Sequence, residues 1–139
     1  MSAPVEPAEL VRRLVAEVWN GDGATAAELV HPRCPGLDGV GPDAVVAWHR
    51  DRRSSFSDLR YEVVDLVAQG DRVSLRWRAA GHHDGPFGPV PATGVGVAYE
   101  GATFVRVAEG LVRDVWSVND LFGLVTQLGA TVVPPADEA

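Results

Sequence analysis

The sequence predicts one α+β domain in which N-terminal helices cover one face of a curved, mostly antiparallel sheet and enclose a pocket. Apolar residues recur at helical spacing over the first third of the chain, alternate with polar residues from Tyr61 onward, and return to helical spacing after Asp120. Helices followed by an antiparallel meander are typical of α+β folds. Such a sheet must twist, and when it curls around helices it encloses a hollow.

Three helices are expected before the sheet, at about residues 10–19, 24–30 and 42–55. In the first, Leu10, Leu14 and Val18 form an apolar stripe that ends at an Asn-Gly-Asp-Gly turn. The second ends at a His-Pro pair, because the residue before a proline is disfavoured in helical geometry. Pro42 favours the start of the third helix. The segment 31–42 is rich in proline and glycine, so it is expected to be an ordered loop or a lid.

Five strands are expected to follow, at about residues 61–67, 72–82, 94–100, 102–108 and from a turn at 109–110 up to Asp120. In the second strand, Trp77 and its alternating apolar neighbours are predicted to face the core. Continuing that alternation places His83 inside and His82 outside. Gly101 is predicted to join the third and fourth strands.

The last helix is expected after Asp120, with Leu121, Leu124 and Leu128 on its buried side. Residues 1–139 are expected to form a single domain, because 139 residues suffice for one substantial core but not for two. Flexible ends are expected near 1–6 and 131–139.

The composition argues against several classes of partner. Lys and Arg number 12 against 19 Asp and Glu, a net charge of −7 without a strong basic cluster, so no nucleic-acid partner is expected. The single Cys34 excludes an intrachain disulfide. No apolar run reaches membrane-spanning length and the N-terminus lacks a signal-peptide pattern, so we expect a cytoplasmic protein with no membrane partner.

The stretch 110–129 carries the main candidate for chemistry. Its apolar period changes from two to helical close to Asp120. Counting back by twos from Asp120 gives Val118, Trp116, Asp114 and Val112, which predicts that the acid and an indole share one face of a strand. If that face points inward, Asp120 is a carboxylate in an apolar hollow with Trp116 as its wall.

Short motifs along nearly the whole chain resemble those of the SnoaL-like polyketide cyclases, a branch of the NTF2-like and ketosteroid isomerase superfamily. The motifs are Glu-Val-Trp-Asn-Gly-Asp at 17–22, Phe-Ser-Asp-Leu at 56–59, Gly-Asp-Arg-Val at 70–73, Gly-His-His at 81–83, Pro-Ala-Thr-Gly at 91–94, Phe-Val-Arg at 104–106 and the segment 116–129. The resemblance implies the cone-shaped NTF2-like fold. It also implies a hydrophobic small-molecule substrate and a homodimer whose sheets pack face to face.

By the same resemblance, Asp120 is the general acid/base of the cyclases and His83 matches a histidine common after the long strand. Two positions depart from the family pattern. Thr103 lies where relatives often carry a His or Asp that assists the acid, and the loop 31–41 carries Arg-Cys-Pro-Gly-Leu-Asp-Gly in place of their acidic or histidine-containing segment. His83 and Asp38 are therefore the available second groups.

Each candidate also has a structural interpretation. Asp120 is either the N-cap of the last helix, worth ~1 kcal/mol, or an acid whose pKa burial raises enough to move protons at neutral pH; we prefer the second. His83 is either a loop histidine or a proton relay. Asp38 is either a turn residue or an acid at the pocket mouth. His31 and His49 are interpreted as structural.

Aromatic residues are expected to supply most of the substrate-binding wall. The predicted wall consists of Trp116, Trp77, Trp19, Tyr99 and Phe104, together with Asp38. A metal site built from the His-His-Asp run at 82–84 is rejected, because neighbouring strand residues point to opposite faces. No cofactor is expected.

The function expected from this pattern is a cofactor-independent cyclase or isomerase that uses Asp120 as general acid/base on a hydrophobic, polyketide-derived molecule. Orientation of the reacting ends in the pocket would assist ring closure. One alternative is an epoxide-opening cyclase or epoxide hydrolase. A second is a non-catalytic module for ligand binding or dimerisation, because this fold hosts proteins of both kinds.

Overall fold

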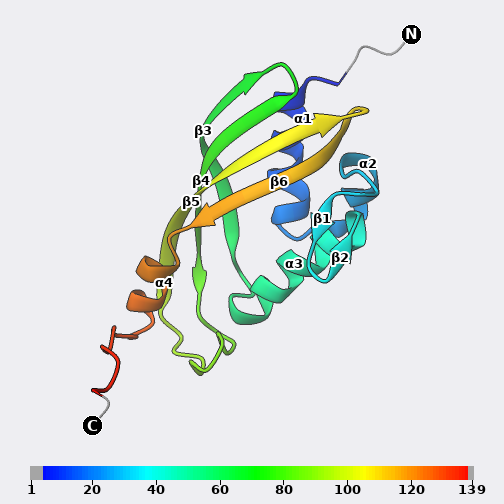
Figure 1. Cartoon of the computed structure of the whole chain (residues 1–139). Coiled ribbons are helices and arrows are strands. Elements are labelled where there is room, and N and C mark those ends of the chain that lie inside the picture. The colour runs from blue at the N-terminus through cyan, green and yellow to red at the C-terminus, as the bar shows by residue number, and fades with distance from the viewer. Residues whose placement is uncertain (1–4, 138–139) are drawn as a thin grey trace.

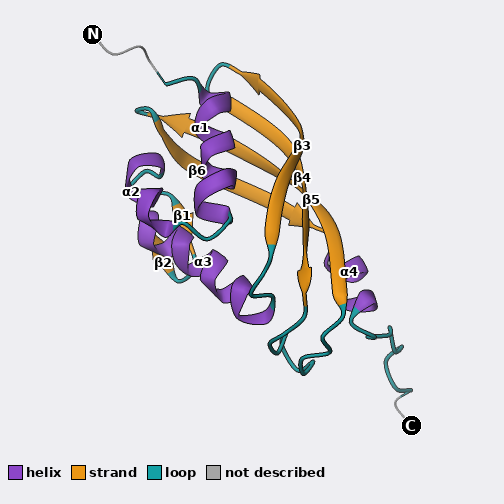
Figure 2. Cartoon of the chain, turned by 180° about the vertical axis from the view of Figure 1, so that it is seen from behind, coloured by secondary structure: helices purple, strands orange, loops and turns teal. Residues whose placement is uncertain are grey.

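The structure is a computed structural model and describes residues 5–137. It confirms the α+β fold, with the helices that precede the sheet packed against the concave face of one curved antiparallel sheet, and the last helix at one end of that sheet (Figures 1 and 2). Residues 131–137 form neither helix nor strand. Residues 1–4 and 138–139, which belong to the predicted flexible ends, lie outside the described residues.

The main sheet has four strands in the order β3-β4-β5-β6, and every neighbouring pair is antiparallel. The strands are β3 Arg60–Gln69, β4 Arg72–His82, β5 Gly96–Ala108 and β6 Leu111–Asn119. The predicted break at Gly101 is wrong, because β5 runs through it. Gly101 pairs with Trp77 on β4, and a Cβ atom there would lie 2.2 Å from the indole ring. The glycine therefore makes room for Trp77 and does not mark a turn.

The helices lie where the periodicity predicts them, with one change of geometry. They are α1 Pro7–Arg13, a π-helical continuation η1 Leu14–Trp19, a 3₁₀ turn η2 Gly23–Thr25, α2 Ala26–Leu29, α3 Pro42–Ser55 and α4 Leu121–Gln127. The loop between α2 and α3 contains a small hairpin of β1 Pro35–Gly36 and β2 Gly39–Val40. None of the described helices is long and apolar enough to cross a membrane.

Two polar side chains fix the end of η1 against the sheet and α3. The Asn20 amide donates to the carbonyl of Tyr61 at 3.0 Å and accepts from its backbone N–H at 2.7 Å. The Arg53 guanidinium donates to the carbonyls of Trp19 and Leu59, both at 2.5 Å. These bonds satisfy buried backbone groups that would otherwise be costly. They place Trp19, Tyr61 and α3 around one space.

A β-bulge in β6 changes which residues face inward. Arg106 pairs with Asp114, but the next residue of β5, Val107, pairs with Val112, so β6 carries one extra residue. A bulge of this kind shifts the alternation by one. Val112 is buried, whereas Trp116 is 61% exposed and its ring lies against Phe104 on the outer face of the sheet. The prediction that Trp116 shares an inner face with Val112 is wrong for this reason.

Candidate active site

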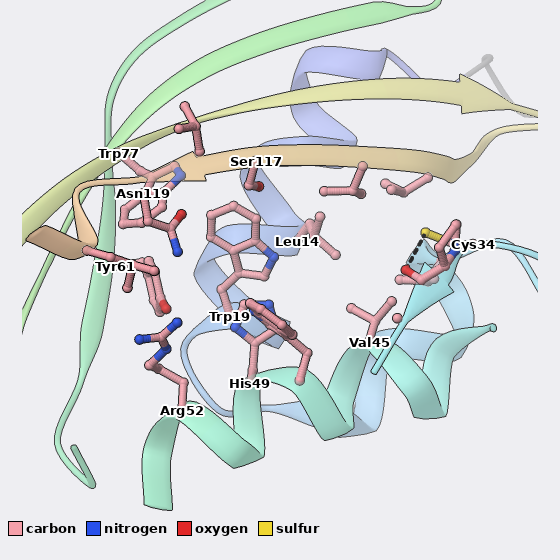
Figure 3. A pocket seen from close by; sticks show the side chains of 18 residues that line it. Leu14, Trp19, Cys34, Val45, His49, Arg52, Tyr61, Trp77, Ser117 and Asn119 are labelled. Carbon is pink, nitrogen blue, oxygen red and sulfur yellow. Dashed lines mark hydrogen bonds between the residues drawn. The ribbon is translucent and has the colours of Figure 1, made fainter. Parts of the chain in front are cut away.

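One cavity of about 560 Å³ opens between the concave face of the sheet and the helices η1 and α3 (Figure 3). One end is mostly apolar and includes Val45 and Cys34. The other end brings together the side chains of His49, Arg52, Tyr61 and Asn119, while Trp19 and Trp77 also line the space. A largely apolar hollow with a few converging polar groups is the usual form of a small-molecule site.

Three polar atoms at the polar end are buried and have no hydrogen-bond partner within residues 5–137. They are Nδ1 of His49, Nη1 of Arg52 and Oδ1 of Asn119. Buried polar atoms in folded proteins are nearly always hydrogen-bonded, and leaving one unpaired costs ~1–3 kcal/mol. All three residues line the same cavity, so unfilled hydrogen-bonding capacity gathers at its polar end.

His49 is held by aromatic packing and stays uncharged. Its ring stacks on Trp19 with the centroids 5.3 Å apart and meets Tyr61 edge-on at 5.8 Å. Burial, with the positive charges of Arg53 and Arg52 added, lowers the pKa of His49 to about 3. At neutral pH the imidazole is therefore a neutral group that can accept a proton.

The buried, neutral His49 predicts a loss of stability in acid. An unfolded chain protonates this histidine below its ordinary value of 6.5, whereas the folded protein keeps it neutral down to about pH 3. Since the unfolded state binds more protons in that window, stability falls as the pH falls through it. Between pH 7 and pH 5, we expect the wild type to lose about 2 kcal/mol more than His49→Gln. Urea unfolding at both pH values measures the difference, and equal losses would contradict the buried neutral state.

Arg52 lies one helical turn beyond His49 on α3, so both side chains face the cavity. The guanidinium carbon sits 5.3 Å from the centre of the Phe87 ring, which provides a cation–π contact. In contrast to Arg53, the Arg52 side chain donates to no backbone carbonyl of the described residues. Tyr61 completes this end, and burial raises the pKa of its phenol, so that its hydroxyl remains protonated.

Comparison with known proteins places the chain in one family. The family model of the SnoaL-like polyketide cyclases matches residues 9–128, which is most of the chain. The chain belongs to the SnoaL-like polyketide cyclase family. This confirms the resemblance seen in the sequence motifs.

The relatives of this SnoaL-like protein include a cyclase and proteins of known structure. Aklanonic acid methyl ester cyclase DnrD of Streptomyces peucetius is 29% identical over 129 residues, covering 87% of this chain and 89% of DnrD. Among solved structures, TsrD of Streptomyces laurentii is 29% identical with a TM-score of 0.78, covering 88% of this chain and 94% of TsrD. AclR of Streptomyces galilaeus, for which hydroxylase activity has been suggested, is 28% identical with a TM-score of 0.77, covering 91% and 98%.

Asp120 does not lie in the cavity of this SnoaL-like fold. Its carboxylate caps α4, accepting from the backbone N–H of Gly123 at 2.9 Å, and the residue is exposed. The cavity is lined instead by its neighbours Asn119 and Leu121. The predicted placement of Asp120 in an apolar hollow is therefore wrong, and the capping interpretation describes its position.

The predicted second groups are also outside the cavity. His83 is buried, as the strand alternation predicts, but it packs against Phe56 and its Nδ1 lies 2.9 Å from the Thr93 hydroxyl. Asp38 is an exposed turn residue with a φ of 52°. Neither residue reaches His49 or the cavity wall. The structure thus places none of Asp120, His83 and Asp38 in the cavity wall.

The predicted aromatic wall divides into three groups. Trp19 and Trp77 line the cavity. Tyr99 is buried behind Trp77, with the ring centroids 5.7 Å apart, and does not line the cavity. Phe104 and Trp116 point away from it, on the outer face of the sheet. The predicted place of Trp116 in the wall is wrong because the bulge reverses the alternation of β6. The predicted place of Phe104 is wrong because its neighbours on β5, Thr103 and Val105, are the residues that face inward.

Sequence reasoning missed His49 and Arg52. The signal that would have found them is the spacing of Val45, His49 and Arg52, which places three residues on one face of α3. Within residues 5–137, no three His, Cys, Asp or Glu side chains gather closely enough to hold a metal ion. The polar groups that line the candidate site are His49, Arg52 and the hydroxyl and amide groups around them.

Proposed function

We propose that the protein closes a ring in a hydrophobic, polyketide-derived substrate by an intramolecular aldol addition inside this cavity. The observation that carries the proposal is the set of three unpartnered polar atoms, on His49, Arg52 and Asn119, at one end of an otherwise apolar space. DnrD, the relative from Streptomyces peucetius, is by name a cyclase that acts on aklanonic acid methyl ester. An aldol addition moves no electrons to or from a partner, so the proposed reaction needs no redox cofactor.

In the proposed reaction, His49 removes a proton from the carbon next to a substrate carbonyl. The Arg52 guanidinium stabilises the negative charge that develops on that carbonyl oxygen. The resulting enolate carbon forms a bond with the carbon of a second carbonyl, whose π bond opens to an alkoxide. The alkoxide takes the proton back from His49, so the product is an isomer of the substrate.

The low pKa of His49 fits this role once the enolate forms. Burial is the main cause of the low value, and the positive charges of Arg53 and Arg52 add to it. A negative charge on the substrate oxygen beside Arg52 opposes these positive charges. The imidazole therefore becomes a stronger base at the moment at which it must accept the proton.

The competing assignment makes Asp120 the general acid/base. The resemblance to the family supports it, but Asp120 does not line the cavity. Its carboxylate would have to leave the cap of α4 to reach a substrate bound between β6 and α3. The two assignments differ in which variant loses turnover, His49→Gln or Asp120→Asn.

The proposal is tested with aklanonic acid methyl ester as the trial substrate. We expect the purified protein to convert it into a cyclised product of unchanged mass, detected by liquid chromatography with mass spectrometry. Orientation of the two reacting ends contributes up to ~7–11 kcal/mol in well-aligned intramolecular reactions, so the cyclisation rate should exceed that in buffer by several orders of magnitude. Binding of the ester without any cyclisation would favour the non-catalytic module.

We further propose that the outer face of the sheet forms a homodimer. A row of side chains crosses this face from Val67 past Ser74 to Phe104 and Trp116, which are cross-strand neighbours in the register. Val67 is 65% exposed, Phe104 50% and Trp116 61%. Three exposed apolar side chains in one row, which only Ser74 interrupts, favour association, and a two-fold axis would pair the row with its own copy.

Trp116→Glu is expected to convert the dimer into a monomer, because it would bury a charge against the apolar row of the partner. Size-exclusion chromatography with light scattering measures the mass. Val40→Glu is the matched control, because Val40 is 62% exposed on the hairpin away from this face and should leave the mass unchanged. A wild-type monomer at micromolar concentration would contradict the dimer.

A further inference from the structure

We infer that Ser117 donates a hydrogen bond to a carbonyl oxygen of the bound molecule, and that a buried hydrogen-bond chain through Thr103 and Trp77 fixes the direction of that hydroxyl. Ser117 lies on β6 after the bulge and lines the cavity. Figure 3 shows it on the strand above Trp19, between Asn119 and Leu14. The inference rests on the proposed function, since it concerns the same cavity.

The chain begins at the indole of Trp77. Its Nε1–H donates to the Thr103 hydroxyl oxygen at 2.9 Å, and that oxygen lies 2.8 Å from the hydroxyl oxygen of Ser117. The three residues come from β4, β5 and β6, and Thr103 and Ser117 are direct cross-strand partners. Hydrogen bonds between such pairs are common in antiparallel sheets.

The burial of Thr103 decides which hydroxyl donates in the hydrogen bond between Thr103 and Ser117. Thr103 is fully buried, and within the described chain its hydroxyl hydrogen has one acceptor, the oxygen of Ser117. If Ser117 donated instead, the Thr103 hydrogen would be buried and unpaired, which is costly. The indole is a donor only, so it cannot accept that hydrogen. Thr103 therefore accepts from Trp77 and donates to Ser117.

The hydrogen of Ser117 is then free to point into the cavity. Successive hydrogen bonds polarise one another, so the end of the chain is a better donor than an isolated serine. A donor that faces an apolar cavity selects an acceptor, and in a polyketide the abundant acceptor is a carbonyl oxygen. Ser117 would hold the carbonyl that is attacked, opposite the one held by Arg52. Thr103 is a positioning residue, because it acts only through Ser117.

The test uses 1-tetralone and tetralin, two probes of the same bicyclic shape of which only the first has a carbonyl. Affinities are measured by ¹H–¹⁵N NMR titration of the indole N–H signals. We expect the wild type to prefer 1-tetralone about 2- to 10-fold, the worth of one neutral hydrogen bond. Ser117→Ala should abolish the preference, Thr103→Val should reduce it, and Thr103→Ser should restore it.

The ligand-free protein gives a second readout. Thr103→Val should shift the Trp77 indole N–H signal upfield, because its acceptor is lost, whereas Ser117→Ala should leave that signal nearly in place. A merely structural role of Thr103 would alter stability but not the ratio of the two affinities.

Two results would overturn the inference about Ser117. Only the second would also contradict the proposed function. A ketone preference that persists in Ser117→Ala, or is missing in the wild type, contradicts the role of Ser117 and leaves the proposed cyclase intact. Failure of the wild type to bind either probe contradicts the cavity as a ligand site, and with it both proposals. Ser117 is exposed at the cavity, so Ser117→Ala decides the matter even if Thr103→Val does not fold.

Discussion

Replacing His49 with glutamine is expected to lower the kcat of ring closure by a factor of ~10² to 10⁴, the usual contribution of a positioned general base. Glutamine keeps a polar side chain of similar length but accepts no proton at neutral pH. Because the apolar walls and Arg52 remain, KM should change little, which is the pattern for an interaction made in the transition state. Single-turnover measurements with aklanonic acid methyl ester separate the chemical step from product release.

Two further variants test whether the loss of turnover is specific to His49. His82→Gln is the matched control, since His82 is exposed and its ring nitrogen lies 2.7 Å from the Asp58 carboxylate, away from the cavity. It should retain wild-type turnover. Asp120→Asn should also retain it, with a small loss of stability from the weaker cap. Full activity in His49→Gln together with a large loss in Asp120→Asn would reinstate Asp120 as the acid/base.

The fold could be predicted from the sequence because it depends on the helical and two-residue spacings of apolar residues along the chain. The alternation around Trp77 predicted β4 with its observed ends at Arg72 and His82. Pro42 marked the start of α3, and the Asn-Gly-Asp-Gly turn marked the end of η1. Gly101 misled the prediction, since a glycine that makes room for an indole looks the same in sequence as one that makes a turn.

The site was less accessible to sequence reasoning because a single extra residue in β6 reverses its faces. Before the bulge Val112 points inward, and after it Ser117 and Asn119 do so. No glycine or proline marks the bulge, which falls among charged residues at Arg113 and Asp114. Counting by twos therefore carried Trp116 and Asp120 into a cavity that they do not reach.

His49 was missed for a different reason. It lies beside three arginines of α3, at positions 50, 52 and 53, which together suggest a solvated surface. Only the tertiary packing on Trp19 and Tyr61 buries its ring and lowers its pKa. The spacing of Val45, His49 and Arg52 places them on one face of α3, but such tertiary contacts decide that this face lines a pocket.

Arg52→Met is expected to lower kcat by a factor of ~10² to 10³, as does the loss of one donor to a developing oxyanion in other enzymes. Methionine retains much of the apolar stem, so the wall of the cavity persists while the charge is removed. Arg52→Lys should recover part of the activity, because lysine restores the charge but not the planar pair of donors. Arg50→Met, on the exposed side of the same helix, is the control and should leave turnover unchanged.

Arg52→Met should also change the pKa of His49. The direction of that change distinguishes a role of Arg52 at the substrate oxygen from a merely electrostatic influence on the imidazole. The positive charge of Arg52 is one cause of the low pKa of His49, so removing it should raise that pKa. NMR titration of the imidazole measures the shift without substrate. A higher pKa makes His49 a stronger base, so a merely electrostatic influence on the free imidazole would raise activity. A fall in kcat together with a rise in the pKa of His49 would therefore assign Arg52 to the enolate oxygen, and a rise in both would contradict that assignment.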